Sequence, residues 1–334
     1  MDSLSVVDLA RRLIDIDSTT HREREAGEVL AGILEDLGWR VRRQPVDDGR
    51  FNVIATLDAA PPVVTFSTHY DCVPPFFPSR VEGDRLFGRG SCDAKGILAA
   101  QVVAAERLRA MGRVAIALLF VVAEERGSEG AMAANRDPLP SRFLINGEPT
   151  DNRLATATGG VLRTRFTASG RAAHSSYPHL GESAIEKLVD AILALRGIDW
   201  PVDQRLGSTT YTVGVIEGGV APNVVPASAR AEVLFRTVGP LDEIRVRLEP
   251  IRRLVRIDDV LIVEPVFMHV VEGFETASFP YTTDVPLLSN WGRPLLYGPG
   301  SVLVAHVDHE HVRIPDLHRA VDDYVRLAAR LMDE

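Results

Sequence analysis

Seven side chains of the types that bind metal ions or move protons stand beside apolar runs in this sequence. In chain order they are His69, Asp71, Asp93, Glu124, Glu125, Glu148 and His306. Each ends or follows a segment that is expected to be buried, where an unpaired charge is unfavourable. Metal ions would compensate these charges, because carboxylates and imidazoles are ordinary metal ligands. The pattern therefore predicts a metal cluster.

His69 and Asp71 are two positions apart at the end of a predicted strand, so their side chains project to the same side. A metal-binding histidine commonly donates its second ring N–H to a carboxylate. We therefore expect His69 to be a ligand and Asp71 to orient it. A His-x-Asp triplet alone is weak evidence, since it occurs by chance in many proteins.

Asp93 lies among three glycines, Gly88, Gly90 and Gly96, at the start of a predicted helix. Glycine permits a sharp turn, and a carboxylate at a helix N-cap is favourable. One interpretation is simply a well-capped helix. The other is that Asp93 bridges two metal ions.

Adjacent glutamates at a strand exit point in different directions and repel each other, so they cannot share one role. We assign Glu124 as general base and later general acid, and Glu125 as a metal ligand. The alternative is an exposed charged turn that continues into Arg126. Glu148 precedes Pro149 and, taken alone, has the pattern of a solvated loop glutamate.

His306 follows the turn Gly298-Pro299-Gly300 and completes the set, although His309 and His311 are competing candidates. Together the residues predict two metal sites, which are His69, Asp93 and Glu148, and Asp93, Glu125 and His306. These ligands suit two zinc ions, with cobalt or manganese as alternatives. Such a pair polarises a carbonyl and lowers the pKa of water, so the predicted chemistry is amide hydrolysis.

Length and composition limit the class of protein. With 334 residues, 46% of them hydrophobic, we expect about two domains. The net charge of -9 is spread along the chain, which argues against nucleic acid and mildly favours a cationic or zwitterionic small molecule. The sequence shows neither a membrane-spanning run nor a signal-peptide pattern, and its two cysteines, Cys72 and Cys92, suit a reducing compartment, so we expect a cytoplasmic location.

The order of predicted elements indicates an α/β fold with an insertion. Strands expected at 39–45, 52–57, 63–68, 114–123 and 142–145, with a helix at 94–111, form a largely parallel sheet in domain 1–158 and 270–334. The intervening domain, 159–269, has the ferredoxin-like order β-α-β-β-α-β: strand 161–168, helix 182–195, strands 208–217 and 229–236, helix 241–254 and strand 260–265. A helix at 316–332 closes the chain.

The motifs resemble the dinuclear zinc peptidase family that includes acetylornithine deacetylase, succinyl-diaminopimelate desuccinylase, aminoacylase and carboxypeptidase G. The resemblance is carried in order by Ser67-Thr68-His69-Tyr70-Asp71, the segment from Gly88 to Gly96, Glu124-Glu125, Gly147-Glu148-Pro149-Thr150, and Gly298-Pro299-Gly300 with His306. It implies a zinc-exopeptidase-like three-layer catalytic domain and an inserted lid and dimerisation domain.

The resemblance also implies roles in substrate handling. In such proteins the inserted domain forms a homodimer, and a histidine that matches His174 holds the oxyanion in the partner subunit's site. Asn223 and Arg236 match positions that bind the substrate carboxylate, and Thr283 lies in a segment similar to a substrate-pocket loop.

The sequence thus favours a homodimeric two-zinc hydrolase that removes an acyl group from an N-acyl amino acid, similar to acetylornithine deacetylase. The sequence context of Glu148 favours the deacylases within the family. The alternatives are a dipeptidase or carboxypeptidase with the same machinery, and a binding protein that keeps this fold without activity.

Overall fold

The computed structural model describes residues 4–57 and 60–334. The chain divides into two compact units. The first contains the chain up to Thr156 together with Met268–Ala277 and Thr283–Glu334, and the second contains Ala157–Phe267 and Ser278–Thr282. The second unit is therefore an insertion in the sequence of the first.

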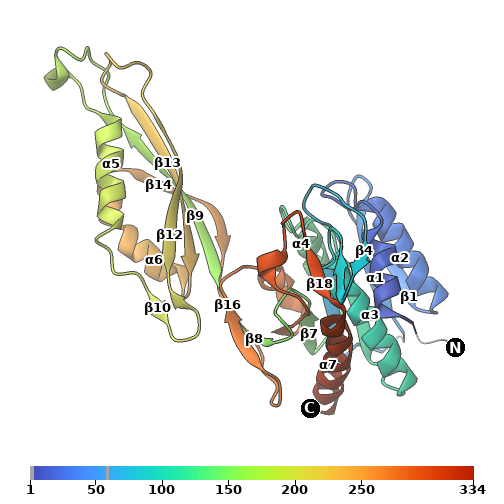
Figure 1. Ribbon diagram of the computed structural model, residues 1–334. Helices are drawn as coiled ribbons and strands as arrows, with labels where there is room; N and C mark the ends of the chain where they lie inside the picture. The colour runs from blue at the N-terminus through green and yellow to red at the C-terminus, as the bar shows by residue number, and fades with distance from the viewer. Residues whose placement is uncertain (1–3, 58–59) are drawn as a thin grey trace. The chain divides into compact units, whose positions relative to one another are not determined.

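A six-stranded sheet forms the centre of the first unit, in the order β1-β2-β6-β3-β7-β17. Figure 1 labels two of its strands, β1 and β7, together with the helices α1, α2, α3, α4 and α7 of the same unit. The strands are β1 (Arg40–Asp47), β2 (Arg50–Thr56), β3 (Val64–His69), β6 (Ile116–Val121), β7 (Phe143–Asn146) and β17 (Arg293–Leu296). The last four are parallel to one another, whereas β1 and β2 pair antiparallel at one edge. The prediction of a mostly parallel central sheet is confirmed.

Helices cover both faces of this sheet, which gives three layers. Neighbouring residues of β6 point to opposite faces: Phe120 packs with one core and Leu119 with the other. On the first face lie α1 (Val6–Ile14), α2 (Arg24–Asp36), α3 (Lys95–Ala110) and α7 (Ile314–Asp333). On the second lie α4 (Glu129–Arg136) and the 3₁₀ segment η3 (Val285–Trp291). Because β6 is buried on both faces, it is a continuous apolar run.

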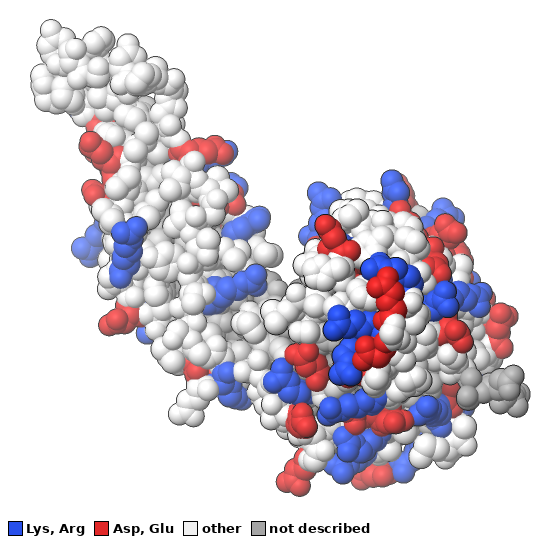
Figure 2. All heavy atoms as spheres, viewed as in Figure 1, with Lys and Arg blue, Asp and Glu red and all other residues white. Residues whose placement is uncertain are grey.

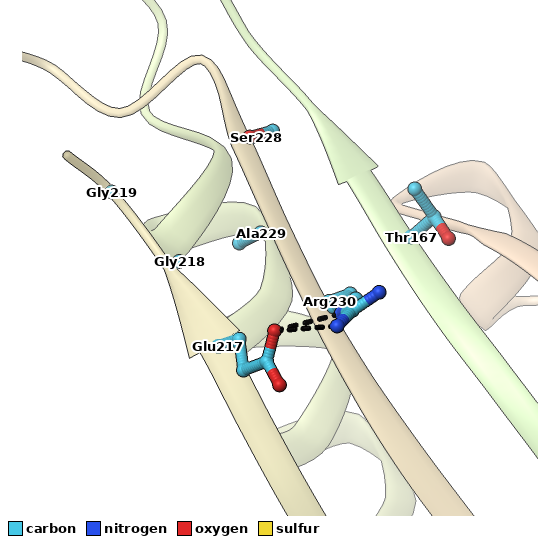
Figure 3. Close-up of a pocket in the computed structure, with 7 residues that line it drawn as sticks. All are labelled: Thr167, Glu217, Gly218, Gly219, Ser228, Ala229 and Arg230. Atoms are coloured by element: carbon cyan, nitrogen blue, oxygen red, sulfur yellow. Dashed lines mark hydrogen bonds and ion pairs between the residues drawn. The ribbon is translucent and has the colours of Figure 1, made fainter.

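The second unit has the predicted ferredoxin-like order of elements. It consists of β9 (Gly160–Ser169), α5 (Ala184–Leu195), β12 (Thr210–Gly218), β13 (Ser228–Thr237), α6 (Leu241–Leu248) and β14 (Arg256–Val263). Its antiparallel sheet has the order β12-β13-β9-β14, so β12 is an edge strand. A shallow pocket of about 390 Å³ lies along these strands, where Glu217 of β12 pairs with Arg230 of β13 (Figure 3).

The shorter strands form three further small sheets among the described residues. Two three-stranded sheets have the orders β15-β8-β16 and β18-β5-β4, and β10 pairs with β11. Their bounds are β4 (Arg80–Glu82), β5 (Arg85–Phe87), β8 (Leu154–Thr158), β10 (Val202–Asp203), β11 (Gly207–Ser208), β15 (Val266–Phe267), β16 (Thr276–Phe279) and β18 (His311–Arg313). The remaining 3₁₀ segments are η1 (Pro178–Leu180), η2 (Ile251–Arg253) and η4 (Val302–Val304).

Several element boundaries differ from the sequence prediction, and three of the differences are informative. The helix expected at 241–254 ends at Leu248, because Pro250 follows, and continues only as η2. The strand expected at 260–265 is β14, which begins four residues earlier at Arg256. The helix expected from Ala94 begins at Lys95, and Ala94 occupies its N-cap without a side-chain hydrogen bond.

Charged side chains of both signs are intermingled over the visible face of the first unit (Figure 2). Within residues 4–57 and 60–334, every helix is too short or too polar to span a bilayer. Cys72 and Cys92 are both buried and both free thiols.

Candidate metal centre

Three parallel strands deliver the predicted residues to one edge of the central sheet. His69 is the last residue of β3 and lies opposite Val121, the last residue of β6. Glu124 and Glu125 follow β6 after a turn, and Glu148 follows β7, whose Asn146 lies opposite Ser67 of β3. The carboxyl ends of parallel strands meet at the same edge, which is where α/β proteins form their sites.

The first group of ligands comprises His69, Asp93 and Glu148, all of them buried. Within this group every pair of ligand atoms lies within 4.8 Å. The Nε2 atom of His69 is 3.0 Å from Oδ1 of Asp93. One oxygen of Glu148, Oε1, is buried without a hydrogen-bond partner among the described residues. An unpaired buried carboxylate oxygen beside an imidazole is the arrangement that a cation would complete.

The second group comprises Asp93, Glu125 and His306. The Nε2 atom of His306 is 3.2 Å from Oδ2 of Asp93 and 2.9 Å from Oε2 of Glu125. Asp93 therefore presents one oxygen to each histidine. This is the bridging position that the sequence predicts for it, and the carboxylate faces the histidines instead of capping α3.

Asp71 is fully buried and contacts the backbone of both glutamates in addition to His69, the one partner that the sequence predicts for it. The hydrogen bond from Nδ1 of His69 reaches the backbone carbonyl of Asp71 at 3.0 Å, and the carboxylate oxygen is farther away, at 3.5 Å. The same carboxylate accepts the backbone N–H groups of Glu124 at 3.1 Å and Glu125 at 3.2 Å. Asp71 thus fixes the backbone that presents both glutamates.

The electrostatics of the ligands are those of a crowded acidic site. Burial raises the pKa of Asp93, but hydrogen bonds from His306 and His69 outweigh it and lower this pKa. Burial lowers the pKa of His69, yet the carboxylates of Asp71 and Asp93 raise it well above its ordinary value. Hydrogen bonds to Asp93 and Glu125 raise the pKa of His306 to about 10. Without metal, protons on the histidines balance the carboxylates.

Glu124 is set apart from Glu125 by its environment. Burial and the nearby charge of Glu148 raise the pKa of Glu124 well above its ordinary value. Burial also raises the pKa of Glu125, but the hydrogen bond with His306 opposes it. A carboxylate with a raised pKa is suited to accept a proton and later to return it. The two glutamates therefore differ in electrostatic environment, and their separate roles stay a prediction.

The competing histidines lie outside both ligand groups. The ring of His311 packs on Phe87, with ring centroids 5.0 Å apart, and its Nδ1 lies 2.9 Å from the carbonyl of His309. Neither residue belongs to either ligand group within the described residues. Glu148 is 6% exposed, so it is not a solvated loop residue.

The candidate substrate residues lie on several elements. His174, Asn223 and Arg236 belong to the second unit and are exposed. Nδ1 of His174 accepts the backbone N–H of Ser176 at 3.1 Å, which leaves Nε2 to carry the proton. In the first unit, Thr283 is buried and its hydroxyl accepts the N–H of Val285 at 3.2 Å.

The sequence prediction missed two buried acids, Asp284 and Glu310. Burial raises the pKa of Asp284 to about 6, and its charge contributes to the raised pKa values of Glu124 and Glu148. It follows Thr283 directly, so the same segment contained the signal. Glu310 stands between His309 and His311, in a run whose composition suggests an exposed turn.

Comparisons with known proteins agree with this geometry. The sequence model of peptidase family M20/M25/M40 matches residues 65–330. A probable carboxypeptidase of Aspergillus terreus is 39% identical, and the match covers 96% of this chain and 85% of that protein.

Two solved structures share the fold. A tripeptidase from Staphylococcus aureus is 18% identical, with a TM-score of 0.80 and 99% of both chains covered. A dinuclear metal-binding M20 peptidase from Bacillus subtilis is 14% identical, with a TM-score of 0.73 and 98% of both chains covered. The resemblance seen in the motifs is confirmed: the chain belongs to peptidase family M20/M25/M40 and is a metallopeptidase.

Proposed function

We propose that this metallopeptidase is a two-metal carboxypeptidase that releases the last amino acid of short peptides. The observation that carries the proposal is the 39% identity to a probable carboxypeptidase over nearly the whole chain. Removal of an acyl group from an N-acyl amino acid, the reaction favoured by the sequence, is the second candidate. The sequence context of Glu148 favours it. Both reactions release an amino acid with a free carboxylate.

The residues present fit two zinc ions, with cobalt or manganese as alternatives. One ion would be held by His69, Asp93 and Glu148, and the other by Asp93, Glu125 and His306. When bound, the pair would polarise the scissile carbonyl and acidify water. Asp71 would hold the backbone of the two glutamates in place.

Glu124 moves the proton in this proposal. It takes a proton from the attacking water, whose oxygen bonds to the carbonyl carbon, and it transfers that proton to the amine as the C–N bond breaks. The raised pKa of Glu124 suits the transfer, and the positive charge of bound ions would oppose this rise.

A substrate panel tests the function. We expect hydrolysis of dipeptides and tripeptides with free carboxyl ends, and none of the same peptides with amidated ends. Hydrolysis confined to N-acetyl-ornithine, N-acetyl-lysine or N-succinyl-diaminopimelate would establish the second candidate. Purified protein that holds two metal ions yet cleaves none of these compounds would refute both candidates.

We also propose that the second unit forms a homodimer. The edge strand β12 exposes Val215 (44%) and Ile216 (62%), and the outer face of α5 exposes Val189 (47%) and Leu193 (48%). Exposed apolar side chains beside an unpaired edge strand favour pairing with a second copy. Ile216→Lys with Val189→Glu should give a monomer by sedimentation that keeps the secondary structure of the wild type by circular dichroism. A double variant that stays dimeric would argue against this interface.

His174 is proposed to stabilise the oxyanion in the partner subunit's site. Its Nε2 is the free donor, and it stands in an uncharged segment, 172–181, at the white end of the second unit in Figure 2. Mixing inactive Glu124→Ala and His174→Ala subunits should then restore about a quarter of wild-type activity, because half of random dimers carry one complete site. No recovery in verified mixed dimers would refute action between subunits.

Arg236 and Asn223 are proposed to bind the substrate carboxylate, and Thr283 to contact the substrate through its hydroxyl proton. Both residues of the second unit are exposed, and a guanidinium binds carboxylates through two parallel hydrogen bonds. Arg236→Met should raise KM more than it lowers kcat. An unchanged KM for peptides with free carboxyl ends would exclude this role for Arg236.

A further inference from the structure

Glu310 is a buried acid that the reaction scheme above does not use. It lies between His306 and β18, four residues after the histidine, and is 0% exposed. Burying a carboxylate without partners is strongly unfavourable. The hydrogen-bond partners of Glu310 therefore show which segment of the chain this carboxylate fixes in place.

Within the part of the chain that the structure describes, the hydrogen bonds of the Glu310 carboxylate go to the segment that carries Asp93. Its Oε1 atom accepts the backbone N–H groups of Gly90, Cys92 and Asp93, each at 3.0 Å. Its Oε2 atom accepts Nη1 of Arg89 at 2.7 Å. Hydrogen bonds to an ionised acceptor are about twice as strong as neutral ones.

The segment from Arg89 to Asp93 is shaped around this carboxylate. Gly90 has a φ of +89°, and a Cβ there would lie 2.7 Å from Sγ of Cys72, so a larger residue does not fit. The N–H of Gly88 also donates to the backbone carbonyl of Glu310 at 3.2 Å. The turn thus presents its donors to one point, which Glu310 occupies.

Two ligands of the second metal group depend on the two segments that meet here. Asp93 belongs to one segment and His306 to the other, and their contact is 3.2 Å. We propose that Glu310 is a positioning residue, which joins these segments and sets the separation of Asp93 and His306 so that the pair binds metal. This inference rests on the proposed metal centre.

A buried carboxylate with four hydrogen bonds also stabilises the fold, so loss of stability alone would not distinguish the two roles. Asp323 offers a matched control. It is 7% exposed, accepts hydrogen bonds from Tyr297 and from Arg326 at 2.7 Å, and bonds to neither segment. Asp323→Asn should lower the unfolding temperature without changing metal binding.

The test is titration of metal-free protein with Co²⁺, followed by its visible absorption and by competition with a chelator. Wild type and Asp323→Asn should bind two ions with equal affinity. Glu310→Gln places an amide N–H₂ against Arg89 and removes the charge, so we expect an affinity loss of about 10- to 100-fold for at least one ion, with a changed absorption spectrum.

The outcomes separate the two proposals. Folded Glu310→Gln that binds two Co²⁺ ions with wild-type affinity overturns the positioning role. If that variant does not fold, Glu310→Asp, which keeps the charge but is too short to reach both Arg89 and the backbone, replaces it with the same criterion. Wild-type protein that binds no Co²⁺ refutes the metal centre itself.

Discussion

Glu124 and Glu125 are neighbours in the chain, yet their surroundings give them different chemistry. Glu125 is paired with His306, whereas the pKa of Glu124 is raised by burial and by the charge of Glu148. Both backbones are anchored on the single carboxylate of Asp71. Each residue can therefore be tested by the property that it alone should control.

Glu124→Gln should abolish proton transfer and leave the ligand set intact. We expect kcat to fall by about 10²- to 10⁴-fold while two metal ions remain bound. Metal content by atomic emission and steady-state kinetics measure the two effects. Glu82→Gln, an exposed glutamate of β4, is the control and should retain full activity. Near-normal turnover of Glu124→Gln would remove Glu124 from the base role.

Asp71→Asn should weaken the centre through the backbone. Its amide can accept only one of the two N–H groups, and its own N–H₂ then opposes the other. We expect metal affinity or kcat to fall by about 10- to 100-fold. Chelator competition and kinetics check this. If both values stay at wild-type levels, the contacts of Asp71 do not position the glutamates.

Most of the side chains that the structure brings together in the two groups could be identified from sequence, because several of them end a recognisable apolar run. His69 ends a buried strand and the Glu124-Glu125 pair follows another. A buried charge is unfavourable unless a partner compensates it, so these positions point to a site. Glu310 could not be identified this way, since its burial arises from distant segments. Glu310 contacts residues about 220 positions earlier, and no local pattern records that.

At the scale of elements, the turn after β6 is held by α4. The side chain of Asn52 accepts the N–H of Val122 at 3.2 Å and donates to the carbonyl of Gly130 at 2.8 Å. A Cβ on Gly130 would lie 2.3 Å from the carbonyl oxygen of Val122. The first turn of α4 is therefore pressed against the strand end that leads to the glutamates.

Gly130→Ala should lower the free energy of unfolding by about 1–3 kcal/mol, because α4 must move away from β6. Gly32→Ala is the matched control: Gly32 is also helical, in α2, but has open space around its Cβ position. That change should raise stability by about 0.5–1 kcal/mol. Urea denaturation of both variants checks the pair, and equal effects would contradict the close packing of Gly130.

The long elements could be predicted from sequence, whereas the short ones could not. β6 and α7 have clear apolar patterns, and the order of the inserted elements identified its fold. The eight-residue helix α4 and the strand β8 were missed, because neither is long enough to establish a period. Pro250 marked the end of α6 more accurately than the apolar pattern did.

For the whole molecule, metal and protons should compete. Without metal, the pKa of His306 is raised from its ordinary value of 6.5 to about 10. The stabilisation that the protonated histidine gives the fold is therefore complete below pH 6.5 and is lost as the pH rises toward 10. The raised pKa values of Glu124 and Glu148 act in the same direction, because above pH 4.5 these acids ionise in the unfolded chain while they stay protonated in the folded one, which favours unfolding. The free energy of unfolding of the metal-free protein should therefore fall as the pH rises.

We expect the unfolding temperatures of metal-loaded and metal-free protein to diverge as the pH rises from about 6.5 to about 9.5, because bound cations replace the lost protons. Calorimetry of zinc-loaded and chelator-treated samples across this range measures the difference. A constant difference at every pH would show that the histidines and glutamates do not exchange protons for metal.

The two buried thiols have a practical consequence. Burial raises the pKa of Cys72 to about 12 and that of Cys92 well above its ordinary value, so neither reacts with an alkylating reagent while the first unit is closed. The rate of maleimide labelling, measured by mass spectrometry, would therefore report how often the first unit unfolds and exposes the thiols. Zinc should slow the labelling of both cysteines by the same factor, so their labelling rates report how strongly bound metal stabilises the first unit.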